Sequence, residues 1–132
     1  MGKKMNKNSY IREVPRASWF LKQPRYIRYM AREVTSLFIG AYTLMLVIAI
    51  KRVAEGPDAF QNFLEILYSP LGILFNISTL LAALYHSTSW FNVTPQAMPI
   101  QWGEEFVSGR IIVGAHYIIW IAISILILVF GV

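Results

Sequence analysis

The sequence predicts an all-α membrane protein with three transmembrane helices. Of its 132 residues, 56% are hydrophobic and only 14% are charged, whereas a soluble domain carries about 25% charged residues. Three apolar runs cover residues 34–50, 71–91 and 111–132, and each is close to the roughly 20 residues that cross a bilayer. The loops between them are short and contain Pro and Gly. We therefore expect a single membrane-anchor domain spanning residues 1–132, without a separate soluble domain.

We expect the first helix at about 24–52, after a basic segment at 1–23. The apolar run itself is slightly short for a span, but Pro24 suits the first position of a helix. The tyrosines that follow it suit the lipid interface. The remaining spans are expected at about 70–91 and 110–132.

Each loop has its own pattern. The loop after the first span has apolar residues at helical spacing, which predicts an interfacial amphipathic helix: Phe60, Phe63, Leu64 and Leu67. The loop at 92–110 contains three helix-breaking residues: Pro95, Pro99 and Gly103. We expect that this loop does not continue the helix.

Charge predicts the orientation. Residues 1–33 hold nine of the twelve Lys and Arg residues and two of the seven acids. Because positive segments stay on the cytoplasmic side, the N-terminus and the 92–110 loop are expected there, and the C-terminus is expected in the periplasm. Lys51 and Arg52 oppose this orientation. Basic residues beside a span favour contact with membrane lipid, and we expect no nucleic-acid partner.

The absence of cysteine limits the chemistry of the chain. An iron–sulfur cluster or a zinc site with thiolate ligands needs cysteine, and we expect no metal site. The sequence also lacks a glycine-rich phosphate loop and a dinucleotide fingerprint. Any redox reaction that the protein serves must therefore use cofactors on other chains.

The candidate functional residues are the ionisable ones inside or beside the spans: Arg32, Glu33, His86 and His116. An ionisable side chain at the centre of a span costs roughly 2.5–3.5 kcal/mol and is a functional candidate by default. Helix directions place these four in one layer near the cytoplasmic face. Ser36 lies one turn after Arg32, and Trp90 lies one turn after His86, so both faces offer space and hydrogen-bonding groups.

Each of these residues also has a purely structural interpretation. Arg32 can be an interfacial anchor, and Glu33 can be an intrahelical partner of a residue one turn before it. The histidines can hydrogen-bond to neighbouring helices. Trp90 can belong to an aromatic belt.

Several motifs match a known family: Trp19-Phe20, Pro24-x-x-x-Arg28-Tyr29-Met30-x-Arg32-Glu33, Gly56-Pro57-Asp58-Ala59, Asn76-x-x-Thr79-Leu80-x-Ala82-Ala83-x-x-His86 and Thr88-x-Trp90-Phe91 with Pro95. In these motifs the sequence resembles the C subunit of the four-subunit fumarate reductase of enterobacteria, a small membrane anchor with three spanning helices. The third helix matches only in character and length, and His116 lies outside the pattern.

The resemblance implies a function. In that family a flavin subunit reduces fumarate and electrons reach it through an iron–sulfur subunit. The C and D subunits attach both to the bacterial cytoplasmic (inner) membrane and help to bind menaquinol in anaerobic respiration. The chain is then not catalytic by itself but is part of a quinol:fumarate oxidoreductase. The resemblance places five residues in the quinone pocket and implies that the anchor has no haem: Arg32, Glu33, Ser36, His86 and Trp90. Ser36 stands where the family has alanine.

The residue types suit this role. Glu33 can accept a proton from the quinol, and Arg32 can stabilise negative charge on the quinone oxygen and keep Glu33 ionised. Trp90 offers a neutral donor, and His86 either a donor or a second proton relay.

Two other interpretations remain open. The chain could be the haem b-binding anchor of a succinate dehydrogenase-type complex, with His86 and His116 as axial ligands. It could also be a small membrane protein without a redox function. A transporter, however, usually shows internal repeats or broken helices near the bilayer midplane, and the sequence shows neither.

Overall fold

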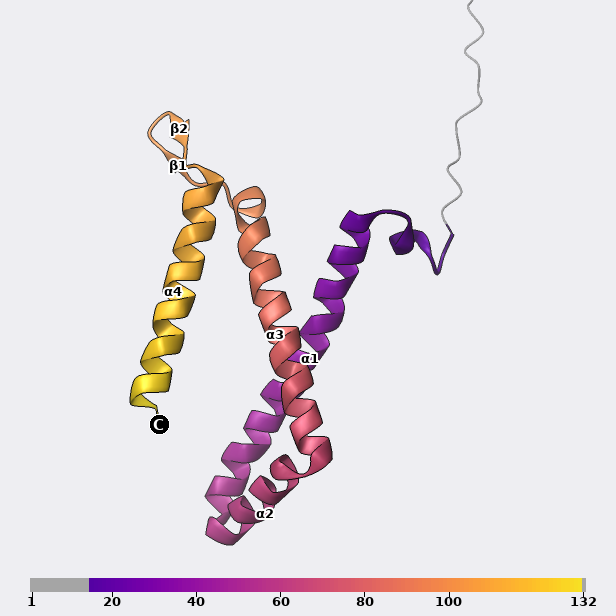
Figure 1. Ribbon diagram of the computed structural model, residues 1–132, viewed down its shortest axis with the longest axis vertical. Helices are drawn as coiled ribbons and strands as arrows, with labels where there is room; N and C mark the ends of the chain where they lie inside the picture. The colour runs from indigo at the N-terminus through magenta and orange to yellow at the C-terminus, as the bar shows by residue number, and fades with distance from the viewer. Residues whose placement is uncertain (1–14, 132) are drawn as a thin grey trace, which may run out of the picture. The chain divides into compact units, whose positions relative to one another are not determined.

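The structure, a computed structural model, describes residues 15–131 and is mainly helical (Figure 1). Its elements are η1 (Trp19–Lys22), α1 (Pro24–Glu55), α2 (Pro57–Tyr68), α3 (Pro70–Ala97), β1 (Gln101–Trp102), β2 (Glu105–Phe106) and α4 (Gly109–Phe130). Three of them, α1, α3 and α4, are long and apolar enough to cross a membrane. The prediction of three spanning helices is confirmed. Residues 1–14 of the expected basic segment and Val132 lie outside the described residues.

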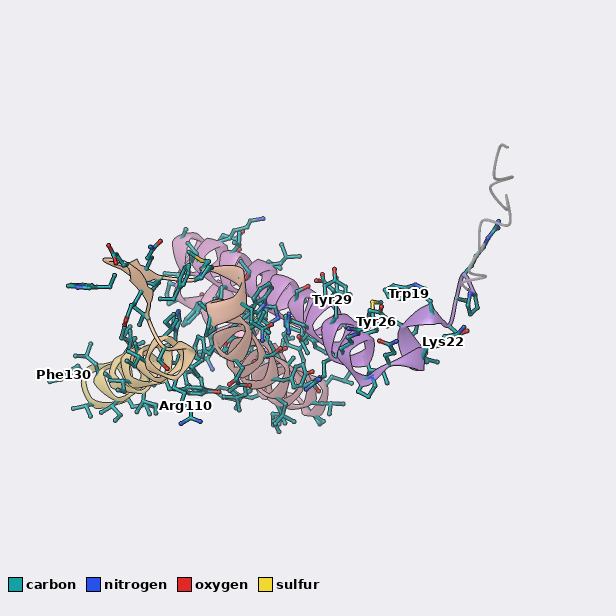
Figure 2. All side chains as sticks on the ribbon, turned by 90° about the horizontal axis from the view of Figure 1, so that it is seen from above. Trp19, Lys22, Tyr26, Tyr29, Arg110 and Phe130 are labelled. Atoms are coloured by element: carbon teal, nitrogen blue, oxygen red, sulfur yellow. The ribbon has the colours of Figure 1, made fainter. Side chains whose placement is uncertain are left out.

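The chain divides into two units, and the boundary between Ala31 and Arg32 falls inside α1. In the first unit, η1 precedes the start of α1 at Pro24, a residue whose fixed φ suits the first helical position. Trp19 meets Tyr26 edge to face, with 5.4 Å between the ring centroids (Figure 2). This aromatic contact joins η1 to the first turn of α1.

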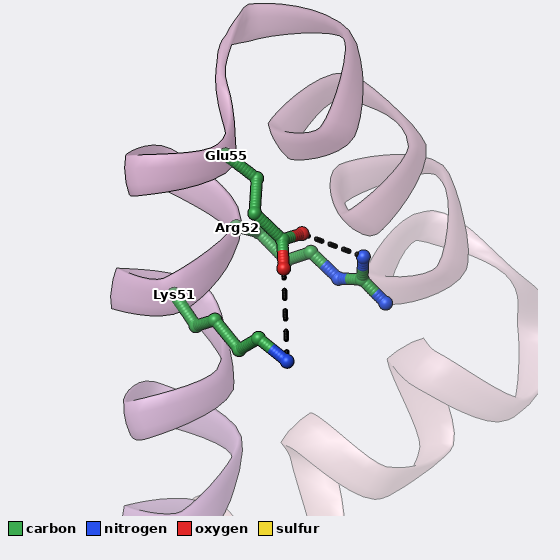
Figure 3. A network of polar contacts seen from close by, with 3 residues as sticks. All are labelled: Lys51, Arg52 and Glu55. Atoms are coloured by element: carbon green, nitrogen blue, oxygen red, sulfur yellow. Dashed lines mark hydrogen bonds and ion pairs between the residues drawn. The ribbon is translucent and has the colours of Figure 1, made fainter.

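At its other end, α1 extends to Glu55, three residues beyond the expected end of the helix. The Glu55 carboxylate forms ion pairs with Arg52, at 2.8 Å, and with Lys51, at 3.6 Å (Figure 3). Pairs at these spacings stabilise the last turn of a helix modestly. The next residue, Gly56, has a φ of +116°, which strongly favours glycine, and the chain turns there.

The predicted amphipathic helix is present as α2. It begins with Pro57, and Asp58 in its first turn complements the helix dipole. Phe60 and Phe63 stack with their ring centroids 6.3 Å apart, and Phe63 is buried. Helix α2 packs against α3.

The prediction that the second span ends near Phe91 was wrong. Helix α3 continues through Pro95 to Ala97. Proline lacks a backbone donor, so Pro95 removes only the helical hydrogen bond to the carbonyl four residues before it, that of Phe91. Side-chain bonds to the helix backbone also form in this last part of α3: Asn92 Nδ2 donates to the Thr88 carbonyl at 2.7 Å, and Thr94 Oγ1 donates to the Trp90 carbonyl at 2.9 Å.

The loop after α3 contains a small hairpin that the sequence patterns did not predict. In the hairpin β1 pairs with β2 in antiparallel register. Gly103 opens its two-residue turn with a φ of +64°, a conformation that glycine adopts readily. The chain then enters α4, which packs against α3. Figure 2 labels Arg110 in the first turn of α4 and Phe130 at its last residue.

Few side chains of the described residues are buried: Phe63, Thr79, Ala82 and Ile112. No residue of α1 is buried. Many large apolar side chains on the three long helices are exposed, as Leu37 and Leu128 illustrate. This is expected of helices that meet lipid or other membrane helices, since lipid imposes no penalty on exposed apolar groups.

Candidate functional site

Arg32 points from α1 toward α3. Its Nε donates a hydrogen bond to Ser89 Oγ at 2.7 Å, and its guanidinium carbon lies 4.7 Å from the centroid of the Trp90 ring. The second contact is a cation–π interaction. The half-buried guanidinium is therefore held by two groups of a different helix.

His86 lies on α3 and faces the same stretch of α1. Its Nδ1 is 3.2 Å from Thr35 Oγ1 and 3.2 Å from the backbone oxygen of Arg32. Thr35 Oγ1 in turn donates to that backbone oxygen at 2.8 Å. The His86 and Trp90 rings are neighbours, with centroids 6.3 Å apart. Arg32, His86 and Trp90 thus form one polar layer between α1 and α3.

The other two predicted site residues lie on the exposed side of α1. Glu33 and Ser36 are both exposed, and Ser36 Oγ donates to the Glu33 backbone oxygen at 2.6 Å. The structure pairs Arg32 with Ser89 rather than with Glu33. Consecutive residues of a helix point about 100° apart, so Arg32 can face α3 while the Glu33 carboxylate faces outward.

Thr35 and Ser89 belong to this site, and sequence reasoning missed them. Each lies three residues after a predicted site residue, Thr35 after Arg32 and Ser89 after His86. This spacing puts both members of a pair on one helix face. The three-residue spacing could have identified Thr35 and Ser89 from the sequence. However, threonine and serine are common in spans and usually bond to their own helix.

His116 makes its contacts outside the layer that the sequence predicted it to share with Arg32 and His86. Its ring packs against Phe91 of α3, with 5.5 Å between centroids, and its Nδ1 is 2.7 Å from the Ile112 backbone oxygen. Tyr117 and Trp120 pack around the same phenylalanine. No hydrogen bond joins His116 to Arg32 or His86 in the described part of the chain, so it contributes to the packing of α3 on α4.

Two hollows among the described residues are lined by residues of α3 and of a neighbouring long helix. One, of about 350 Å³, is lined by Tyr42, Asn76, Thr79, Leu80 and Ala83. Thr79 is 3% exposed, and its hydroxyl has no hydrogen-bond partner among residues 15–131. The second, of about 530 Å³, is lined by residues of α3 and α4: Asn92, Pro95, Gln96, Gly109, Arg110, Val113 and Gly114. Neither hollow is lined by a predicted site residue.

The described residues contain no cluster of three or more His, Cys, Asp or Glu side chains that could hold a metal ion. The layer around Arg32 is therefore described by its hydrogen-bonding groups: one guanidinium, one imidazole, one indole and two hydroxyls. The guanidinium, the indole and the hydroxyls can donate hydrogen bonds, and the imidazole can also accept a proton.

The chain is similar to known proteins over most of its length. A profile of the family described as the fumarate reductase C subunit matches residues 5–132. This chain belongs to the fumarate reductase C-subunit family. Its relatives include the fumarate reductase C subunit of Vibrio cholerae serotype O1, 35% identical over 124 residues that cover 94% of this chain and 97% of the relative.

Two further relatives support the assignment. The fumarate reductase C subunit of Vibrio vulnificus is 36% identical over 124 residues. That of Mycobacterium tuberculosis is 30% identical over 109 residues, which cover 83% of this chain and 86% of the relative. The family and the three long apolar helices support a membrane-anchor role, within a complex that contains other fumarate reductase subunits.

Proposed function

We propose that this chain attaches the flavin and iron–sulfur subunits of fumarate reductase to the bacterial cytoplasmic membrane and forms part of the site that oxidises menaquinol. The D subunit of the same complex, a second membrane protein, completes the anchor. The observation that carries the proposal is the polar layer between α1 and α3, in which Arg32 is held by Ser89 and Trp90 beside His86. A charge placed at such a position in a span is a functional candidate.

The residues of the layer suit a quinol. Oxidation of menaquinol releases two protons and two electrons, so the site needs proton acceptors and groups that stabilise negative charge on oxygen. Arg32 supplies a fixed positive charge, Trp90 an N–H donor, and His86 an imidazole. All three lie within one polar layer. Arg32 and His86 are half-buried, and Trp90 is partly exposed.

Glu33 and Ser36 complete the proposed site from the neighbouring face of α1. Because the Glu33 carboxylate is exposed on this chain, it can meet water or a partner protein and pass a proton onward. Ser36 is a small residue next to it. The incomplete enclosure of the layer within this chain agrees with a site shared between subunits.

Electrons must leave through another chain. The sequence contains no cysteine to hold an iron–sulfur cluster. In our proposal the iron–sulfur subunit receives the electrons and the flavin subunit reduces fumarate. This chain contributes proton acceptors and charge stabilisation, and it is not catalytic alone.

The charges support an orientation with the N-terminus in the cytoplasm and the C-terminus in the periplasm. Residues 1–33 hold nine of the twelve basic residues. The two basic residues that oppose this orientation, Lys51 and Arg52, are both paired with Glu55 (Figure 3). Their positive charge is therefore partly compensated at the periplasmic end of α1.

Two substitutions test the proposed function in the assembled complex. Arg32→Gln removes the charge, and Glu33→Gln removes the proton acceptor, while both keep hydrogen-bonding groups. Each should lower menaquinol-driven fumarate reduction by roughly 10²-fold, as expected for the loss of an electrostatic group or a general base. Fumarate reduction driven by a dye that feeds the soluble subunits directly should stay near normal.

The measurement is the ratio of quinol-driven to dye-driven activity in membranes with matched complex content. Arg52→Gln is the control, because it removes a charge at the opposite end of the same helix. A ratio that is unchanged in both site variants would contradict the proposed quinol site. Loss of both activities together would assign these residues to assembly instead.

A further inference from the structure

Two oxygen atoms surround Nδ1 of His86. One is the backbone oxygen of Arg32 and the other is Thr35 Oγ1, each at 3.2 Å. A carbonyl oxygen can only accept a hydrogen bond. Nδ1 must therefore carry the proton, since an unprotonated Nδ1 would face this oxygen lone pair to lone pair.

Thr35 fits the same assignment. Its hydroxyl hydrogen is donated to the Arg32 backbone oxygen at 2.8 Å, so a lone pair of Oγ1 is left to accept from Nδ1–H. In the Nε2–H tautomer, Nδ1 would be a second acceptor beside the Arg32 backbone oxygen. The single hydrogen of the Thr35 hydroxyl could then bond only one of the two. The local network is thus fully satisfied only when His86 is protonated at Nδ1.

The position of this proton also determines the state of the other ring nitrogen of His86, Nε2. When the ring is neutral it carries one N–H, and with that proton on Nδ1 the Nε2 of His86 has a free lone pair. It has no hydrogen-bond partner within residues 15–131. The Arg32 guanidinium and the Trp90 ring lie in the same layer, so an unprotonated nitrogen is available where the proposed site needs a proton acceptor.

We propose that Thr35 is a positioning residue that holds His86 in the Nδ1–H tautomer, so that Nε2 of His86 accepts one of the two quinol protons. This inference rests on the proposed function. Nε2 forms an N–H bond as one quinol O–H bond breaks, and the Glu33 carboxylate takes the second proton. The two electrons pass to the iron–sulfur subunit of the complex. The Arg32 backbone oxygen then stabilises the imidazolium through Nδ1–H.

The tautomer can be read directly in the purified complex by ¹⁵N solid-state NMR with labelled histidine. The His86 signals are those lost in His86→Gln, and the one-bond correlation to Cγ identifies Nδ1. We expect the proton on Nδ1 in the wild-type complex. A proton on Nε2 would overturn the proposal, whatever the activity of the complex.

Variants of Thr35 separate positioning from packing. Thr35→Val keeps the size but removes the hydroxyl, and it should shift the population toward the Nε2–H tautomer. It should also lower quinol-driven activity about tenfold, the effect of losing roughly one hydrogen bond, without changing dye-driven activity. Thr35→Ser should restore both the tautomer and the activity.

Thr43→Val is the matched control. It removes a hydroxyl from the same helix that donates only to the Ile39 backbone oxygen, at 2.9 Å, and it should change neither readout. Unchanged tautomer and activity in Thr35→Val would refute the positioning role while leaving the proposed function intact. An unchanged activity ratio in Arg32→Gln and Glu33→Gln would instead refute the quinol site, while the tautomer remained as measured.

Discussion

Arg32 shows how one charged side chain is accommodated at the edge of a membrane span without an acidic partner. A charge at the centre of a span costs roughly 2.5–3.5 kcal/mol on insertion scales. The hydrogen bond from Arg32 to Ser89 has a charged donor, and a bond of this kind contributes about 1.5–3 kcal/mol. The contact with Trp90 adds about 0.5–2 kcal/mol. Together these two contacts from α3 contribute about 2–5 kcal/mol, a range that overlaps the cost of a charge at the centre of a span.

Thr79 differs from Arg32 in that its polar group is unpaired within the described chain. Its hydroxyl is buried and has no hydrogen-bond partner there. An unsatisfied buried group costs about 1–3 kcal/mol. Thr79→Val, which is similar in shape, should therefore leave the thermal unfolding midpoint of the purified complex unchanged or raise it. A clear fall in the midpoint would show that a partner protein, lipid or water bonds this hydroxyl in the assembled complex.

At the scale of elements, the corner between α2 and α3 is built by specific local chemistry. Ser69 Oγ accepts from the backbone N–H of Gly72 at 3.2 Å and donates to the Ile66 carbonyl at 2.6 Å. Pro70 then opens α3. A Cβ on Gly72 would collide with the backbone oxygens of Ile66 and Leu67. The close approach of the two helices therefore requires glycine at this position.

Gly72→Ala should destabilise the protein by about 1–3 kcal/mol, because the backbone must move to relieve the collision. Gly40→Ala is the matched control: it adds the same methyl group to a spanning helix, but beyond its chain neighbours and the adjacent backbone of its own helix no atom of the described residues lies within 4 Å of the new Cβ. Thermal shifts of the two purified variant complexes provide the comparison. Equal midpoints would contradict the assigned role of Gly72.

At the scale of the whole molecule, the three long helices leave most of their apolar side chains exposed. Helix α1 has 32 residues, which corresponds to about 48 Å at 1.5 Å per residue. This is longer than the roughly 30 Å hydrocarbon core, so α1 can extend beyond the bilayer. The exposed helix surfaces are available to lipid and to other subunits of the complex.

The two histidines allow a prediction about haem at the same scale. His86 faces Thr35 of α1, while His116 packs against Phe91. His86 and Phe91 are five residues apart on α3, which turns their directions about 140° from each other. The two imidazoles therefore lie on different sides of α3 and are badly placed to bind one iron from opposite faces.

We therefore expect no bis-histidine haem b within this chain. A reduced-minus-oxidised absorption spectrum of the purified complex tests this expectation, with His86→Ala and His116→Ala as the comparison variants. Haem b bands that disappear in both variants would contradict it and would favour the succinate dehydrogenase-type alternative.

Much of the helical architecture could be predicted from the sequence, because it depends on local properties. Apolar runs long enough to cross the bilayer predicted the three spans. The spacing of Phe60, Phe63 and their neighbours predicted α2. The predicted end of α3 was wrong because Pro95 was taken as a helix breaker, whereas a proline near a helix end removes only one backbone hydrogen bond.

The sequence by itself determined that this is a three-span chain resembling the fumarate reductase C subunit, with five candidate site residues: Arg32, Glu33, Ser36, His86 and Trp90. Only the tertiary structure decided their partners: Ser89 for Arg32, Thr35 for His86, and Phe91 for His116. The physical reason is that hydropathy and helical period fix which residues share a span and a face. Contacts between helices depend instead on the rotation and axial position of each helix, which are set by packing between residues far apart in the chain.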